Sequence, residues 1–251
     1  MASLEEVVAF LERELKTGEI QDYPGALNGL QLQNGGEVPR VIAAVDASLP
    51  VIEKAAAGGP GLLIVHHGMF WQGAQPLTGA FFRKIRTAMD AGLAIYSSHL
   101  PLDFHPEWGN NVLLCRAIGL ENLRPFMESK GKAMGLRGDW SGTREELKVR
   151  VQDAVGGSVH VCEGGKHGIS TVGVVTGGAG SEVAKAAADG VDAFITGEGP
   201  HWSFTLAEEL GINVFYGGHY ATETFGVKAL AAVISEKFGV PAEFLDHPTG
   251  L

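Results

Sequence analysis

The sequence predicts an α/β protein made of two related halves, in which mostly parallel sheets are flanked by helices. Residues 41–67 and 171–197 share, without a gap, an apolar strand, a small-residue turn, an Ala-rich helix, a Gly turn and a second apolar strand. This order is a βαβ unit, whose crossover makes the two strands parallel neighbours in one sheet. Residues 91–103 and 210–223 extend the likeness with a further short strand followed by His-x3-Asp/Glu.

The elements follow from local signals. Residues 3–15 are amphipathic, and we expect a helix there with Ser3 as N-cap and Glu6 three residues later. Within the repeat, each crossover helix follows a small-residue turn that contains a serine, Ser48 in the first half and Ser181 in the second. Convergent α/β patterning is the alternative to a true internal duplication, since Ala-rich crossover helices are common.

The region between the halves, residues 121–170, is less regular. Residues 125–132 are polar and indicate a loop or the entry into an antiparallel strand. Thr143 and Glu146 form a capping box that opens a helix, and residues 158–164 alternate like a strand. We expect this region to form a small subdomain that covers the second sheet.

The composition limits the class of function. A formal charge of −10 disfavours nucleic-acid binding as the main activity, because phosphate neutralisation needs a basic surface. Two cysteines suggest no disulfide framework and favour a reducing compartment, and we expect a cytoplasmic protein. No run of 18 apolar residues and no apolar signal core are present, so a membrane span is not expected.

The most informative segment is the buried-strand pattern of residues 62–65, which leads directly into His66 and His67. Two imidazoles at the end of a buried strand are good ligands for a borderline metal ion. They would point to opposite faces of a regular strand, so they can share a site only if the strand ends there, as Gly68 permits. Capping of backbone carbonyls is the structural alternative.

Other polar residues follow other predicted strands and complete a mixed nitrogen and oxygen donor set. Such a set suits Zn, Mn, Fe or Co. Because it exceeds the needs of one tetrahedral ion, we predict two divalent metal ions, which would polarise a substrate oxygen and lower the pKa of a bridging water. Asp103 could instead begin a turn, and the Glu223 carboxylate could interact favourably with the dipole of the helix that it begins. The predicted metal ligands are His66, His67, Asp103, His219 and Glu223.

Three further residues are candidates for catalytic roles. His99 precedes Asp103 by four residues and could orient a ligand, shuttle a proton or be structural. Glu198 and His201 occupy the place in the second half that the His66 pair occupies in the first. They could hold the ligands in place, act as a base or contact substrate.

Weaker signals surround these segments. Trp71, Trp108 and Trp202 follow the proposed site segments and could line its mouth or pack in the core. Residues 177–181, GGAGS, precede a helix and resemble a phosphate-binding turn, although the Lys-Ser/Thr of a P-loop is lacking.

Several motifs together, in order and spacing, resemble the Nif3-like family, whose members are also described as homologues of a type 2 GTP cyclohydrolase I. The resemblance covers nearly the whole chain and has HHG where many relatives have HHP. The motifs are NGLQL (28–32), VDAS (45–48), LLIVHHGMFW (62–71), YSSHLPLD (96–103), GGAGS (177–181), DAFITGE (192–198) and GGHYATE (217–223).

The resemblance implies two interlinked α/β domains, a dinuclear metal site in the cleft between them and a toroidal homohexamer. We predict residues 1–120 with 219–251 as the first domain and 121–218 as the second. The implied activity is a metal-dependent, GTP cyclohydrolase-like hydrolysis of a C–N bond in a nucleotide or related small molecule. A metal-dependent phosphoesterase and a non-catalytic hexameric metal-binding scaffold or regulator are the alternatives.

Overall fold

The computed structural model describes residues 1–129 and 132–251, which form two compact units. Unit 1 comprises residues 1–105 and 226–247, and unit 2 comprises residues 106–225 and 248–251. Unit 1 is therefore discontinuous in sequence. The domain bounds expected from the sequence differ from these units by the segments 106–120, 219–225 and 248–251, which belong to unit 2 in the structure.

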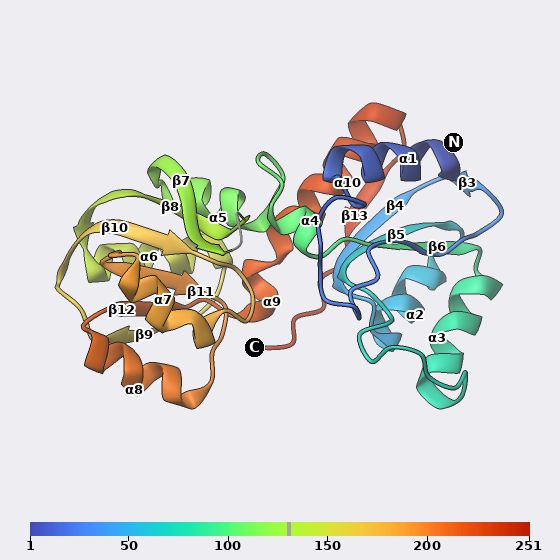
Figure 1. Ribbon diagram of the computed structural model, residues 1–251. Coiled ribbons are helices and arrows are strands. Elements are labelled where there is room, and N and C mark those ends of the chain that lie inside the picture. The colour runs from blue at the N-terminus through green and yellow to red at the C-terminus, as the bar shows by residue number, and fades with distance from the viewer. Residues whose placement is uncertain (130–131) are drawn as a thin grey trace. The chain divides into compact units, whose positions relative to one another are not determined.

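The sheet of unit 1 has the spatial order β13-β4-β5-β6-β2 (Figure 1). Its first four strands are parallel, and β2 pairs antiparallel with β6 at the edge. The short strands β1 (Ala2–Ser3) and β3 (Glu37–Val38) form a separate antiparallel pair. The strands of the larger sheet are β2 (Gly29–Leu32), β4 (Val41–Asp46), β5 (Gly61–His67), β6 (Leu93–Ser97) and β13 (Ala242–Phe244).

Helices cover both faces of this sheet (Figure 1). Alternate strand residues such as Ile42, Leu63 and Ile95 are buried in one core cluster with Ile52 of α2 and Ala88 of α3. Helices α1 and α10 lie on the other face. Ser3 is the N-cap of α1, as predicted, because its Oγ accepts a hydrogen bond from the Glu6 N–H at 3.5 Å. The helices are α1 (Leu4–Leu15), α2 (Leu49–Ala57), α3 (Gly79–Asp90), α4 (Leu100–Asp103) and α10 (Thr224–Phe238).

The sheet of unit 2 has the spatial order β7-β8-β10-β11-β12-β9. Strands β10, β11 and β12 are parallel, and β9 closes the far edge antiparallel to β12. Strands β7 and β8 are an antiparallel pair, and residues 130–131 of the expected loop or strand entry lie outside the described residues. The strands are β7 (Glu121–Ser129), β8 (Lys132–Thr143), β9 (His160–Glu163), β10 (Gly168–Val174), β11 (Ala193–Thr196) and β12 (Asn213–Tyr216).

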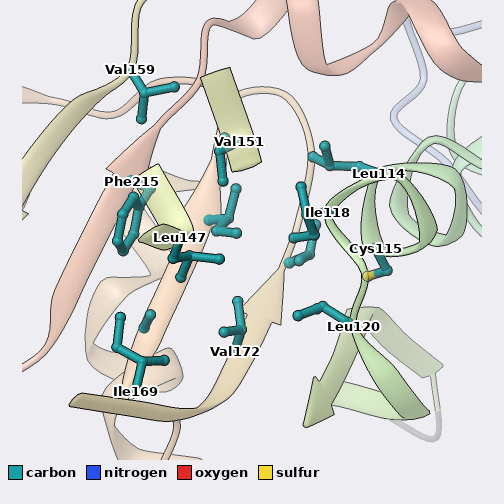
Figure 2. Close-up of a cluster of buried hydrophobic side chains, with 13 residues drawn as sticks. Leu114, Cys115, Ile118, Leu120, Leu147, Val151, Val159, Ile169, Val172 and Phe215 are labelled. Carbon is teal, nitrogen blue, oxygen red and sulfur yellow. The ribbon is translucent and has the colours of Figure 1, made fainter. Parts of the chain in front are cut away.

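Unit 2 also has hydrophobic cores, one of which is shown in Figure 2. Leu114, Cys115 and Ile118 of α5 pack there with Leu147 of α6 and Phe215 of β12. This burial explains why the segment 106–120 belongs to unit 2. The helices are α5 (Asn110–Ile118), α6 (Arg144–Val155), α7 (Val183–Ala188), which follows the 3-10 turn η1 (Gly180–Glu182), α8 (His201–Leu210) and α9 (His219–Thr222).

The capping box predicted at the start of α6 is confirmed. The Thr143 Oγ1 accepts a hydrogen bond from the Glu146 N–H at 3.2 Å, and the Glu146 carboxylate accepts one from the Thr143 N–H at 2.7 Å. These reciprocal bonds satisfy two backbone donors that the first turn of a helix otherwise leaves without a partner.

Each of the two sheets contains the parallel strands that the sequence predicts. In each, three parallel strands are followed by an antiparallel edge strand, which the sequence did not predict, in the order β4-β5-β6-β2 and β10-β11-β12-β9. The register also corresponds: Ala44 pairs with Val65 in unit 1, and Val174 pairs with Ile195 in unit 2, which are equivalent positions of the ungapped alignment. Duplication of an ancestral unit stays a prediction.

Among the described residues, no helix combines the length and the apolar character that crossing a bilayer requires.

Candidate functional site

The histidine pair lies where strand β5 ends. His66 and His67 are its last residues, and their ring centroids are 4.9 Å apart. Gly68 follows, and a Cβ at that position would collide with the side-chain amide of Gln31. Gln31 also accepts the Met69 N–H at 2.8 Å, so the missing side chain permits the close approach that turns the chain out of the sheet. The expected end of the strand is therefore confirmed.

His99 joins this pair. It follows β6, the parallel neighbour of β5, and one ring nitrogen from each of His66, His67 and His99 lies within 4.8 Å of the other two. Parallel strands place their carboxyl ends at the same edge of a sheet, which accounts for the convergence. The structure thus places His99 among the candidate ligands themselves, where the sequence left orienting, proton-shuttling and structural roles open.

His66 is fully buried, and an oxygen atom faces each of its ring nitrogens. Its Nδ1 lies 2.9 Å from the Ser98 carbonyl oxygen, and its Nε2 lies 3.5 Å from the Asp103 Oδ2. A carbonyl oxygen only accepts hydrogen bonds, so Nδ1 of His66 is the donor in its contact with Ser98. Asp103 ends the short helix α4 and is buried, so it faces the histidine rather than beginning an exposed turn.

The other two imidazoles of unit 1 are anchored by carboxylates. The Nδ1 of His67 is 2.9 Å from the Asp46 Oδ1, and the Nδ1 of His99 is 2.9 Å from the Asp22 Oδ1. A carboxylate that accepts the Nδ1–H proton of a metal-binding histidine fixes the tautomer and orients the ring.

Asp22 is built to stay ionised. Burial alone would raise the pKa of its carboxyl group, but hydrogen bonds from His99, Asn28 and the Leu100 N–H lower that pKa below its ordinary value. Asn28 also fixes the backbone of the next segment, since its Oδ1 accepts the His99 N–H at 2.7 Å. Asp22, Asn28 and Asp46 received no role from the sequence, although Asn28 and Asp46 belong to the NGLQL and VDAS motifs.

An aromatic side chain borders this group. The Trp71 ring contacts the His67 and His99 rings edge to face, with centroid separations of 5.8 and 4.9 Å. Its side chain remains partly exposed, so Trp71 lies at the mouth of the histidine group rather than in the core. Trp202 is exposed on α8.

Unit 2 carries a second group, built around His219. The Nδ1 of His219 lies 2.8 Å from the Glu198 Oε1, and its Nε2 lies 3.2 Å from the Glu223 Oε2. His219 begins α9, and Glu223 is the buried residue that separates α9 from α10. Burial would lower the pKa of His219, but the hydrogen bonds and negative charges of Glu223 and Glu198 raise it to about 9. This arrangement attracts positive charge.

The GGAGS turn packs closely against this group. Gly177 has a φ of +71°, and a Cβ there would collide with the Glu223 carboxylate. Its N–H donates to the Thr222 Oγ1 at 3.0 Å, and the N–H groups of Ala179 and Gly180 donate to other protein oxygens. Because these donors are engaged within the protein, the expected phosphate-binding turn is not supported.

The two remaining predicted residues have different surroundings. Glu198 Oε1 lies 2.8 Å from Nδ1 of His219, and the roles expected for Glu198 stay predictions. His201 is the exposed first residue of α8 and lines a hollow of about 560 Å³ in unit 2. The candidate donors are thus His66, His67, His99 and Asp103 in unit 1, and His219 and Glu223 in unit 2.

These features define a two-unit α/β protein with histidine and carboxylate donors at the carboxyl ends of parallel strands. A family model described as Duf34/NIF3 (NGG1p interacting factor 3) matches residues 2–249. The chain therefore belongs to the Duf34/NIF3 family.

Relatives and solved structures agree with this assignment. The chain is 42% identical to a "GTP cyclohydrolase 1 type 2 homolog" of Deinococcus radiodurans, with 98% of this chain and 94% of the relative covered. A protein of the same name from Pyrococcus abyssi is 41% identical, over 98% and 99% of the two chains. A crystal structure of a Thermus thermophilus protein matches with a TM-score of 0.91 and 39% identity, over 100% of both chains.

Proposed function

We propose that this protein is a metal-dependent hydrolase that binds two divalent ions, Zn, Mn, Fe or Co, and cleaves a C–N bond of a nucleotide or related small molecule. The proposed ligands are His66, His67, Asp103, His219 and Glu223. The names of the relatives make GTP the first substrate to test.

The observation that carries this proposal is the anchoring of the imidazoles. In four histidines, Nδ1 faces a carbonyl or carboxylate oxygen, as in the side chains that ligate metals in proteins. The four histidines are His66, His67, His99 and His219. The remaining donors are carboxylates, and such a mixed set fits a first-row divalent ion that keeps positions open for substrate.

The histidines and carboxylates would hold the divalent ions, which would supply polarisation of a substrate oxygen and a lowered pKa of bound water. The residues of the chain supply the rest of the chemistry. Glu198 accepts the Nδ1–H of His219 and thereby holds this ring in one tautomer. The Trp71 ring packs edge to face against the rings of His67 and His99. His99, placed within reach of the pair, is positioned to bind an ion or to pass a proton.

The test begins with metal analysis of the purified protein by mass spectrometry, before and after removal and resupply of each ion. Metal-loaded protein is then screened with GTP, other nucleotides and cyclic amides, with formate and ring-opened products as the readout. We expect two ions per chain and turnover that depends on them. Glu223→Ala should abolish both, whereas replacement of the exposed His167 by Ala should change neither.

Three results would redirect the proposal. If neither purified nor resupplied protein binds metal, the proposed ligands are wrong. Metal binding without turnover of any substrate would support the non-catalytic scaffold. Release of phosphate with the base intact would support the phosphoesterase.

We also propose a homohexamer, on the basis of the family resemblance. Light scattering should then give six times the chain mass of 26.4 kDa. A mass equal to one or two chains would contradict this assembly.

A further inference from the structure

Three glycine-containing loops meet beside the carboxylates of unit 2, and they follow the parallel strands β10, β11 and β12. Backbone hydrogen bonds connect them. The Gly177 carbonyl accepts the Gly197 N–H at 2.8 Å, and the Gly197 carbonyl accepts the Gly218 N–H at 2.9 Å. The absence of a side chain permits this approach, because a Cβ on Gly197 would lie 2.6 Å from the Cα of His219.

Gly177 connects the backbone segments that carry the two carboxylates facing His219. Its carbonyl accepts the Glu198 N–H at 3.1 Å. Its own N–H donates at 3.0 Å to the Oγ1 of Thr222, the residue that precedes Glu223. One residue of the GGAGS turn is therefore bonded to both segments, and it fixes the spacing between them.

The Thr222 hydroxyl links the turn to the short helix α9. The residue is fully buried, and its Oγ1 accepts the Gly177 N–H. The same hydroxyl donates to a carbonyl near the start of α9, either that of Gly218 at 2.9 Å or that of His219 at 3.0 Å. A hydroxyl can donate and accept at once, and Thr222 uses both capacities. Valine has a similar shape and neither capacity, so it would leave a buried N–H without this acceptor.

Thr196, the last residue of β11, makes a second link to the same turn. It is fully buried, and its Oγ1 donates to the Gly177 carbonyl at 3.1 Å and accepts the Ala179 N–H at 3.2 Å. Gly177 is thus bonded through its N–H to one threonine and through its carbonyl to another. The polar groups of the GGAGS turn are used to order the donor segments.

We propose that Thr222 and Thr196 are positioning residues for the donor group of unit 2, and that they act through the GGAGS turn. By fixing Gly177, they hold the Glu223 carboxylate, which packs directly against this glycine, in place beside the Nε2 of His219. This role rests on the proposed function, because His219 and Glu223 are proposed metal ligands. The placement of the two side chains is nevertheless measurable in metal-free protein.

The first measurement is therefore made without metal. NMR spectra of isotope-labelled protein record the ring nitrogens of His219, and their chemical shifts report the contacts of the ring with Glu198 and Glu223. Thr222→Val should move these signals toward their positions in urea-unfolded protein. Thr222→Ser, which keeps the hydroxyl, should restore the wild-type positions.

The second measurement is metal affinity, determined by competition with a chelating dye. Thr222→Val should weaken it by about 10–100-fold, as loss of the groups that orient metal ligands does. Thr222→Ser should bind metal like the wild type.

Thr171→Val is the matched control for both measurements. The Thr171 Oγ1 also accepts a backbone N–H, that of Asp192 at 3.2 Å, but it does so at the strand ends opposite to the donors. This variant should change neither the His219 signals nor the metal affinity. If Thr222→Val does not fold, Thr196→Val takes its place. It should move the His219 signals in the same direction but less, since the Gly177 carbonyl keeps its two backbone donors.

The proposal fails if the His219 signals of the folded valine variants match those of the wild type. It also fails if Thr171→Val moves them equally, because a general loss of stability would then explain the effect. Absence of bound metal in every variant would contradict the proposed function alone, since the NMR measurement needs no metal. The two proposals can therefore fail separately.

Discussion

The donor groups of units 1 and 2 differ in how imidazoles and carboxylates are combined. In unit 1, three imidazoles each place Nδ1 against an oxygen, and the Asp103 carboxylate faces the Nε2 of His66. In unit 2, one imidazole lies between two carboxylates, and the pKa of His219 rises to about 9. The first group is rich in imidazole nitrogens, whereas in the second the two carboxylates favour a positive charge at the single imidazole. Equivalent strand ends of two similar sheets therefore carry different electrostatics.

The largest expected effect comes from removing one ligand in each unit. His66→Ala leaves Asp103 without its imidazole, and His219→Ala leaves two carboxylates facing each other. We expect each variant to lose bound metal during gel filtration, as measured by mass spectrometry, while circular dichroism shows the wild-type fold. If either variant keeps two ions, the donor group that it alters is not a metal site, and the comparison of two metal-binding groups is wrong.

The next effect concerns the anchoring carboxylates of unit 1. In Asp46→Asn, the amide can donate to Nδ1 of His67 and so stabilise the wrong tautomer. We expect metal affinity to fall by about 10–100-fold, the usual cost of losing such a partner. Asp90→Asn, an exposed residue of α3 paired with Arg86, is the control. Equal affinities of both variants, measured by competition with a chelating dye, would mean that Asp46 does not tune the ligand.

A third prediction compares the strand ends opposite to the donors. In unit 1, the Arg40 guanidinium donates to the carbonyls of Ala55, Gly59 and Pro60. Arg40→Ala should lower the free energy of unfolding by about 1.5–3 kcal/mol, the range for hydrogen bonds to a charged group. Urea denaturation measures this change, and an unchanged midpoint would contradict it.

In unit 2, the Asp192 carboxylate holds together the strand ends opposite to the donors, as the Arg40 guanidinium does in unit 1. Burial would raise its pKa, but Lys166 and the N–H groups of Ser170 and Thr171 lower it below the ordinary 3.8. A lowered folded pKa stabilises the fold above about pH 4, and this stabilisation disappears as the pH falls through the folded value. Asp192→Asn should cost about 1–2 kcal/mol at pH 7. The variant should also lose less stability than the wild type as the pH falls below 4. An acid unfolding transition identical to that of the wild type would contradict this prediction.

The smallest expected effect is a difference in stability between alanine substitutions of two serines that the repeat aligns. Ser48 is the N-cap of α2, where its Oγ accepts the Val51 N–H at 3.4 Å. Ser181 lies inside the 3-10 turn η1 and is not an N-cap. We expect Ser48→Ala to cost about 1 kcal/mol, and Ser181→Ala to leave the thermal midpoint unchanged. Equal effects would mean that the two turns are more alike than their backbones indicate.

The sequence predicted the periodic features well. The aliphatic run before His66 and the capping residues Ser3 and Thr143 depend on near neighbours in the sequence, and the parallel pairing of β4 with β5 follows from the order of the βαβ unit. The family and the α/β class followed from motifs spread over the whole chain.

What the sequence could not predict depends on contacts between distant residues. Asp22 is separated from His99 by 77 positions, and no local pattern marks it as the anchor of that ring. The glycines of the GGAGS turn suggested an anion, yet Gly177 is there because the Glu223 carboxylate takes up the space of a side chain. The place of α5 in unit 2 was likewise decided by the burial of residues such as Leu114.

The anchored imidazoles have a consequence for the entropy of ion uptake. A histidine that rotates in solution gives up rotamer freedom when it binds an ion, and this lowers affinity. His66, His67 and His99 have already lost that freedom during folding, because Ser98, Asp46 and Asp22 hold their rings. Ion binding therefore orders few further side chains in unit 1. Because the ions bind the folded state, the free energy of binding raises the free energy of unfolding. On this basis, heating should release the ions and melt unit 1 in a single transition.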